Sequence, residues 1–112
     1  NQEYGDTLRL RLVHRVRHFR RRLTEVGFAA SGGLFPVQTL LPIPHCEPAM
    51  LHERLLRLGI RTVLRRGHNG SGPCLSFLIT ALHPLSAIDH AVEELVRAVR
   101  SAIVEDNLRS AL

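Results

Sequence analysis

Apolar residues recur at helical spacing near the start of the chain. Between residues 8 and 26 they fall on one side of a helix, which predicts an amphipathic helix that ends at Gly27. Residues 1–7 are polar, so we expect them to fray, with Asp6 or Thr7 as the helix cap. The apolar stripe consists of Leu12, Val13, Val16, Phe19, Leu23 and Val26.

Three shorter apolar stretches predict strands, over residues 34–41, 60–65 and 75–80. Pro36 lacks a backbone N–H, so it indicates the start of the first strand or an edge position. Residues 29–33 are small and predict a turn that leads into this strand.

Two further apolar stripes predict helices. The first covers residues 48–58 and ends at Gly59. The second begins at Ser86 as N-cap, with Asp89 three residues on as a variant of the capping box. Residues 105–112 either extend this helix or fray. The second stripe consists of Ile88, Val92, Leu95, Val99 and Ile103.

The element order is helix, strand, helix, strand, strand, helix, within a single domain over residues 1–112. A loop rich in glycine at residues 67–73 predicts a hairpin that makes the last two strands antiparallel neighbours. We therefore expect an α+β fold: a two-layer small domain with a three-stranded, mainly antiparallel sheet and helices packed on one face.

Composition excludes two classes of site. The chain has 112 residues, 15 arginines, no lysine and a net charge of +5. Without lysine it cannot carry a catalytic Schiff-base amine or the lysine of a phosphate-binding P-loop. We also expect no signal peptide and no membrane span, and hence a soluble cytoplasmic domain.

The cysteines and histidines predict no metal site. His45 and Cys46 are adjacent, but no further ligands follow at metal-binding spacing. For Cys46 and Cys74, a chain without a secretory signal favours reduced thiols over a disulfide.

The arginines of the first helix allow two interpretations. They form either a surface for nucleic acid or an acidic partner, or a solvated outer face. Phe19 is the one aromatic residue among them and lies on the apolar stripe, so base stacking is disfavoured and the solvated face is preferred. These arginines are Arg9, Arg11, Arg15, Arg17, Arg20, Arg21 and Arg22.

Several segments together resemble a known family. They are Gly-Leu-Phe-Pro-Val-Gln at residues 33–38, Leu-Gly-Ile at 58–60, Leu-Ser-Phe-Leu-Ile-Thr-Ala-Leu-His at 75–83, and Ile-Asp at 88–89. The pattern, from Ser31 to Val99, resembles the C-terminal small domain of pyridoxal-phosphate enzymes of the aspartate aminotransferase superfamily. The branch it is most similar to is that of the α-oxoamine synthases, of the 8-amino-7-oxononanoate synthase type.

The resemblance implies a division of labour between two domains. A large catalytic domain of the same chain would carry the lysine, the cofactor contacts and the catalytic residues. The small domain would close over the substrate and bind its carboxylate through an arginine. The parent enzyme would use pyridoxal phosphate to condense an amino acid with an acyl-CoA, and would be a homodimer. This piece alone would be inactive, with no catalytic, cofactor-binding or metal-binding residue and no covalently bound cofactor.

The expected carboxylate-binding arginines are absent from their positions. The branch has two arginines in the strand before the Ser/Thr-Ala-x-His segment. Counted back from His83, they fall on Cys74 and Ser76. Arg65 and Arg66 lie across the predicted hairpin, and we treat both as candidate substitutes.

Two histidines complete the candidate set. His68, with Asn69 and Ser71, either faces a substrate or only shapes the turn, and the turn signals favour the second interpretation. His83 either supports the transition from strand to helix, which we favour, or contributes to the substrate site. The candidate substrate-binding residues are therefore Arg65, Arg66, His68, Ser76 and His83.

Two other function classes stay open. In the first class, the chain belongs to another enzyme of the superfamily, an aminotransferase or a lyase. Outside it, the chain is a non-catalytic basic domain that binds nucleic acid or an acidic partner, although nucleic acid is the less favoured partner. Tight binding to DNA or RNA with steep salt dependence would favour the basic domain.

Overall fold

The computed structural model describes residues 2–66 and 72–111. Within them the chain forms three helices and four strands. The helices are α1 (Gln2–Glu25), α2 (Pro48–Arg57) and α3 (Leu85–Ala111). The strands are β1 (Ala30–Ser31), β2 (Val37–Leu40), β3 (Val63–Arg66) and β4 (Pro73–Leu78). None of these helices has both the length and the apolar character needed to cross a bilayer.

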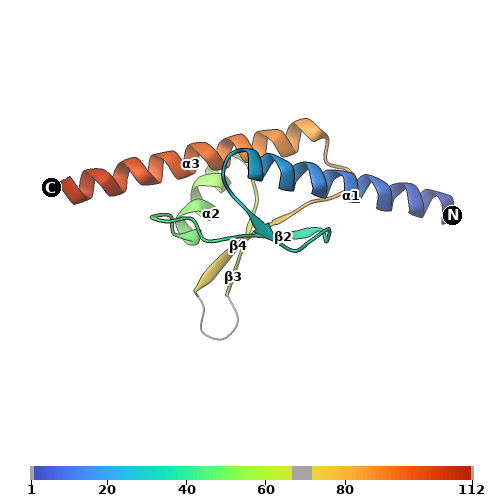
Figure 1. The fold of residues 1–112 in the computed structure, drawn as a ribbon, viewed down its shortest axis with the longest axis horizontal. Coiled ribbons are helices and arrows are strands. Elements are labelled where there is room, and N and C mark those ends of the chain that lie inside the picture. Colours follow the sequence, from blue (N-terminus) through green and yellow to red (C-terminus); the bar gives the residue numbers. More distant parts are fainter. Residues whose placement is uncertain (1, 67–71, 112) are drawn as a thin grey trace.

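The elements form two layers, as Figure 1 shows. The sheet has the order β1-β2-β4-β3, and every neighbouring pair is antiparallel. α1 and α3 run side by side in the same direction on one side of it, and each projects past the sheet at one end. α2 packs against α3, β3 and β4. The α+β class and the antiparallel pairing of the last two strands are confirmed.

The core lies between the helices and one face of the sheet. The rings of Phe19 on α1 and Phe77 on β4 are 5.1 Å apart at 47°, a tilted aromatic contact. Leu55 on α2 and Leu95 on α3 are fully buried beside them. One apolar stripe per helix therefore meets one face of the sheet, as the periodicity predicted.

The prediction of three strands was wrong, because a short strand lies in the segment expected to be a turn. Ala30 pairs with Leu40 and Ser31 with Thr39, which adds β1 at the edge of the sheet. The carbonyl of Ala30 also accepts a hydrogen bond from Arg20 on α1 (2.9 Å). Pairing and this arginine, rather than strand propensity, stabilise β1.

Both long helices extend further than their stripes predicted. α1 begins at Gln2, so the expectation that residues 2–7 fray was wrong. Contacts within the helix support its first turns: Arg9 pairs with Asp6, and the Thr7 hydroxyl donates to the carbonyl of Glu3. α3 continues to Ala111, in line with the extended alternative.

The predicted cap of α3 was also wrong. The helix begins at Leu85, and the carbonyl of Pro84 accepts hydrogen bonds from Ala87 N (3.0 Å) and Ile88 N (3.4 Å). Asp89 does not close a capping box, because its carboxylate contacts α1 instead.

Candidate functional site

Among the described residues, no helix packs on one face of the sheet. Side chains alternate along a strand, and on β4 Leu75 and Phe77 face the helices, so Cys74, Ser76 and Leu78 face the other way. The strand register places residues of β2 and β3 on the same side. We call this surface the open face; its members are Val37, Thr39, Val63, Arg65, Cys74, Ser76 and Leu78.

The open face is apolar for a surface. Val37, Val63 and Leu78 are 38%, 51% and 55% exposed, and they surround the polar centre of the face. Helices cover only the opposite side of the sheet (Figure 1). A half-apolar sheet surface of this kind is typical of an interface with another domain or protein.

Ser76 lies at the centre of the open face but is covered by its neighbours. Thr39 pairs with it on one side and Val63 on the other, and its hydroxyl is hydrogen-bonded to that of Thr39 (2.9 Å). Its exposed fraction is 1%. Ser76 therefore stands where the family pattern has an arginine, with its hydroxyl engaged by Thr39.

The register separates the two candidate arginines. Arg65 pairs with Cys74 and Arg66 with Pro73. Arg65 therefore belongs to the open face, one strand away from the positions expected to hold arginine. Arg66 follows it in the strand and belongs to the opposite face. Both are exposed, so a guanidinium can extend from either.

His68 lies outside the described residues, as do Asn69 and Ser71.

His83 shapes the connection between β4 and α3. Its Nδ1 accepts a hydrogen bond from Thr80 N (3.1 Å), and its carbonyl accepts one from Arg15 Nε on α1 (3.2 Å). The predicted part in the transition from strand to helix is confirmed. Because Nδ1 accepts, the ring proton is on Nε2.

An apolar cavity that the sequence did not predict lies next to His83. It has a volume of about 460 Å³ and lies between the end of β4, the start of α3 and the segment that follows α2. It opens on the helix side of the sheet, and its lining includes Leu78, which also belongs to the open face.

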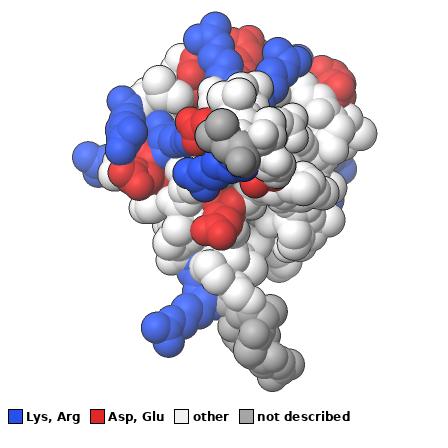
Figure 2. All heavy atoms as spheres, turned by 90° about the vertical axis from the view of Figure 1, so that its left-hand side faces the viewer, with Lys and Arg blue, Asp and Glu red and all other residues white. Residues whose placement is uncertain are grey.

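Part of the arginine-rich helix is used to hold the fold together. Arg20 donates to the Ala30 carbonyl and to Oε1 of the buried Gln38 (2.8 Å), and Arg15 reaches the carbonyl of His83. Figure 2 shows basic and acidic side chains interleaved at the end of the molecule where α3 ends. Because Arg15 and Arg20 are bonded within the chain, fewer of the α1 arginines are available to form a surface for nucleic acid or an acidic partner.

A charged cluster joins α1 to α3. Arg21 Nη2 donates to His18 Nδ1 (2.9 Å), so His18 Nε2–H donates to Asp89 Oδ1 (2.6 Å). Arg22 Nε lies 3.0 Å from the same carboxylate oxygen. The hydrogen bond from His18 is the largest cause that lowers the pKa of Asp89; partial burial opposes it and Arg22 adds to it.

The lowered pKa of Asp89 predicts an acid-sensitive contribution to stability. Asp89 stabilises the fold above its unfolded-state pKa of about 3.9, and this contribution disappears as pH falls through the lower folded-state pKa. We expect Asp89→Asn to lower the urea midpoint at pH 7 and to have little effect at pH 2. The effect is modest, because the side chain is 36% exposed.

Asp6→Asn is the matched control, since the partner of Asp6 is Arg9 on its own helix. We expect a smaller change at pH 7 for this variant. An equal loss of stability for Asp89→Asn at both pH values would contradict an ionised Asp89 in the fold.

The chain's own residues do not fit a covalent cofactor site. Pyridoxal phosphate is attached through a lysine, and the sequence has none. Among the described residues no group of His, Cys, Asp or Glu is placed to hold a metal ion. Cys46 and Cys74 are free thiols, and burial raises the pKa of Cys46.

No protein-family model and no curated protein matches the chain. Solved structures do match. The 8-amino-7-oxononanoate synthase of Francisella tularensis has a TM-score of 0.69 at 16% identity, over 82% of this chain and 27% of its own. A serine palmitoyltransferase structure with pyridoxal phosphate has a TM-score of 0.70 at 22% identity, over 84% and 25%. The glutamate decarboxylase of Lactobacillus brevis has a TM-score of 0.68 at 17% identity, over 82% and 23%.

The chain thus spans about a quarter of the length of these solved structures. At identities below 25%, TM-scores of 0.69 and 0.70 show a common fold, and one of the matched structures contains pyridoxal phosphate. The resemblance seen in the sequence is confirmed at this level. This chain has the fold of about a quarter of the 8-amino-7-oxononanoate synthase, serine palmitoyltransferase and glutamate decarboxylase structures.

Proposed function

We propose that this chain is the substrate-closing C-terminal domain of a pyridoxal-phosphate-dependent acyltransferase, of the 8-amino-7-oxononanoate synthase type. The parent enzyme condenses an amino acid with an acyl-CoA, and this domain alone is inactive. The observation that carries the proposal is the open face. It is partly apolar, free of helices and built on the strand where the family pattern has its substrate arginines.

The large domain of the same protein supplies the cofactor site in this proposal. Pyridoxal phosphate bound there would supply an electron sink for the reaction of the amino acid. The residues of this chain contact the substrate from the side opposite the cofactor. The apolar rim of Val63 and Leu78 excludes water as the domain closes, which strengthens charged contacts beneath it.

Arg65 is the residue we propose for the substrate carboxylate. A guanidinium binds a carboxylate through two parallel hydrogen bonds, and Arg65 is the candidate arginine that shares a face with Cys74 and Ser76. Arg66 belongs to the opposite face of the same strand, so the two adjacent arginines form a matched pair for a test.

We expect Arg65→Ala, in the full-length enzyme that contains this domain, to lower kcat/KM for the amino acid about 10- to 100-fold. That range follows from about 1.5–3 kcal/mol for a hydrogen bond to a charged group. Most of the change should appear in KM for the amino acid, because a carboxylate contact binds ground state and transition state alike. Steady-state kinetics with the acyl-CoA saturating provide the measurement.

Arg66→Ala is the control and should leave kcat/KM within about threefold of the wild-type value, as a solvent-facing residue would. Equal effects of the two substitutions would show that the face of the sheet on which an arginine lies does not decide whether it binds the substrate carboxylate. If neither substitution changed KM or kcat, Arg65 would not be the carboxylate ligand.

The match to a glutamate decarboxylase favours a second candidate, in which the parent enzyme is an amino-acid decarboxylase. Release of free CoA on mixing an amino acid with an acyl-CoA would identify the acyltransferase. Release of carbon dioxide from the amino acid in the absence of acyl-CoA would identify a decarboxylase instead.

A further inference from the structure

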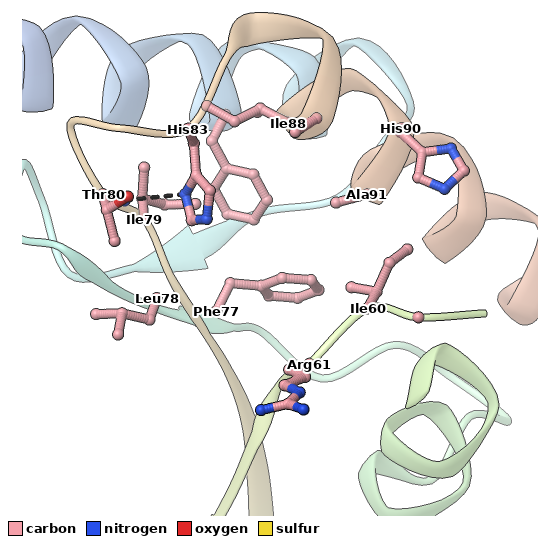
Figure 3. Close-up of a pocket in the computed structure, with 13 residues that line it drawn as sticks. Ile60, Arg61, Phe77, Leu78, Ile79, Thr80, His83, Ile88, His90 and Ala91 are labelled. Carbon is pink, nitrogen blue, oxygen red and sulfur yellow. Dashed lines mark hydrogen bonds between the residues drawn. The ribbon is translucent and has the colours of Figure 1, made fainter. Parts of the chain in front are cut away.

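The proposed ligand contacts of the open face make no use of the cavity beside His83. Its volume of about 460 Å³ lies within the range of small-molecule sites. Figure 3 shows it bounded by the end of β4, the start of α3 and the segment around Ile60. Because it lies on the helix side of the sheet, it is separate from Arg65 and Ser76.

Its walls are apolar and rigid. Phe77 forms the floor and Ile88 the opposite wall, and both belong to the buried core. Ile60 projects into the space from the segment after α2, and Ala91 on α3 leaves room because its side chain is small. Elements of regular structure hold three of these four side chains, so the space is preformed and favourable for an apolar ligand.

The ionisable groups that line the cavity are all basic or neutral. They are Arg61, His83 and His90, and no Asp or Glu is among the lining residues. Arg61 stands at the rim, with its guanidinium directed outward in Figure 3. A cationic ligand would find no carboxylate here, whereas an anionic group at the mouth would lie close to Arg61.

His83 adds a directed donor inside the cavity. Its Nδ1 is occupied by Thr80 N, so its proton lies on Nε2, on the side of the ring that faces the space above Phe77. No hydrogen-bond partner for Nε2 occurs among the described residues. A purely apolar ligand would leave this N–H unpaired, whereas a ligand oxygen would accept from it.

We propose that this cavity binds a small amphiphilic carboxylate, with its apolar chain against Phe77, Ile60 and Ile88. The carboxylate accepts from His83 Nε2–H, and the Arg61 side chain at the rim rotates toward the cavity to pair with it. The proposed ligand contacts do not include Arg65 or Ser76, so this site is separate from the proposed carboxylate site, although Leu78 lines the cavity and also belongs to the open face.

Octanoate, octanol and octylammonium are suitable probes, because they share a chain and differ in the head group. Titration of the 112-residue chain, which has its own buried core, is followed by calorimetry. We expect octanoate to bind about tenfold more tightly than octanol, as one charge-assisted contact predicts, and octylammonium to bind least tightly.

Substitutions then locate the site. Arg61→Gln should weaken octanoate about tenfold and leave octanol unchanged, which removes the preference for the acid. Arg57→Gln is the matched control, since Arg57 is exposed on α2, pairs with Glu53 and does not line the cavity. Ala91→Phe should abolish binding of both probes by filling the space. Ala87→Leu, at an exposed lining position, does the same with less risk to folding.

Three results would overturn the proposal. They are the absence of saturable octanoate binding, equal affinities for octanoate and octanol in the wild-type chain, and unchanged binding in folded variants with a filled cavity. Thermal unfolding of each variant shows that it is folded. None of these measurements depends on enzyme activity, so failure here leaves the proposed function untouched.

Discussion

Leu75→Ala is expected to lower the free energy of unfolding by about 2–5 kcal/mol. Leu75 is 1% exposed and lies on β4, which is paired on both sides, with β2 and with β3. The backbone there cannot move in to fill the space that the substitution leaves. Since domains of this size are stable by only about 5–15 kcal/mol, the loss is a large fraction of the total. Urea denaturation at pH 7 measures it.

Leu78→Ala removes the same atoms from the same strand and is the control. Leu78 is 55% exposed on the open face, so the loss in the 112-residue chain should be below about 1 kcal/mol. Similar losses for the two leucines would show that both faces of the sheet are covered, and the open face would no longer be a surface available to a second domain.

Helical periodicity predicted the helices well because each helix buries one stripe. Val16, Phe19 and Leu23, taken from the spacing of apolar residues alone, are the buried residues of α1. The ends of the helices were harder to predict, because polar pairs such as Asp6 and Arg9 extend α1 beyond its stripe. Apolar spacing carries no information about turns that such pairs stabilise.

The edge strand β1 could not be predicted from local sequence. Ala30 and Ser31 have weak strand propensity, and they are extended because β2 pairs with them and Arg20 holds the carbonyl of Ala30. Both contacts join residues that are distant in sequence. The pattern of neighbouring residues along the chain does not predict such contacts.

The sequence predicted which residues belong to the candidate site, but not which face of the sheet each of them lies on. The family pattern drew attention to Cys74 and Ser76, and proximity across a hairpin drew attention to Arg65 and Arg66 together. Only the register shows that Arg65 and Arg66 belong to opposite faces, since a shift by one residue would exchange them. The cavity beside His83 has no sequence signal, because four separate segments form it.

The turn between β1 and β2 depends on a close approach that only glycine allows. Gly32 has a φ of 127°, and a Cβ atom there would lie 2.4 Å from the carbonyl oxygen of Val37. The same turn places the carbonyls of Gly33 and Phe35 on the side-chain amide of the buried Gln38, at 3.1 Å and 2.7 Å. A displaced turn would therefore also leave a buried amide unsatisfied.

Gly32→Ala is accordingly expected to destabilise the fold by about 3 kcal/mol or more, from backbone strain and the displaced Val37 carbonyl. The adjacent Gly33→Ala separates strain from close contact. Gly33 has a φ of 53°, in the left-handed helical region, and no atom lies within 4 Å of its added Cβ. Its expected cost is about 1–2 kcal/mol, from conformation alone. Urea denaturation of the two variants measures the difference. If they lost equal stability, the close packing of Gly32 against Val37 would not contribute, and the turn would need only a positive φ at both positions.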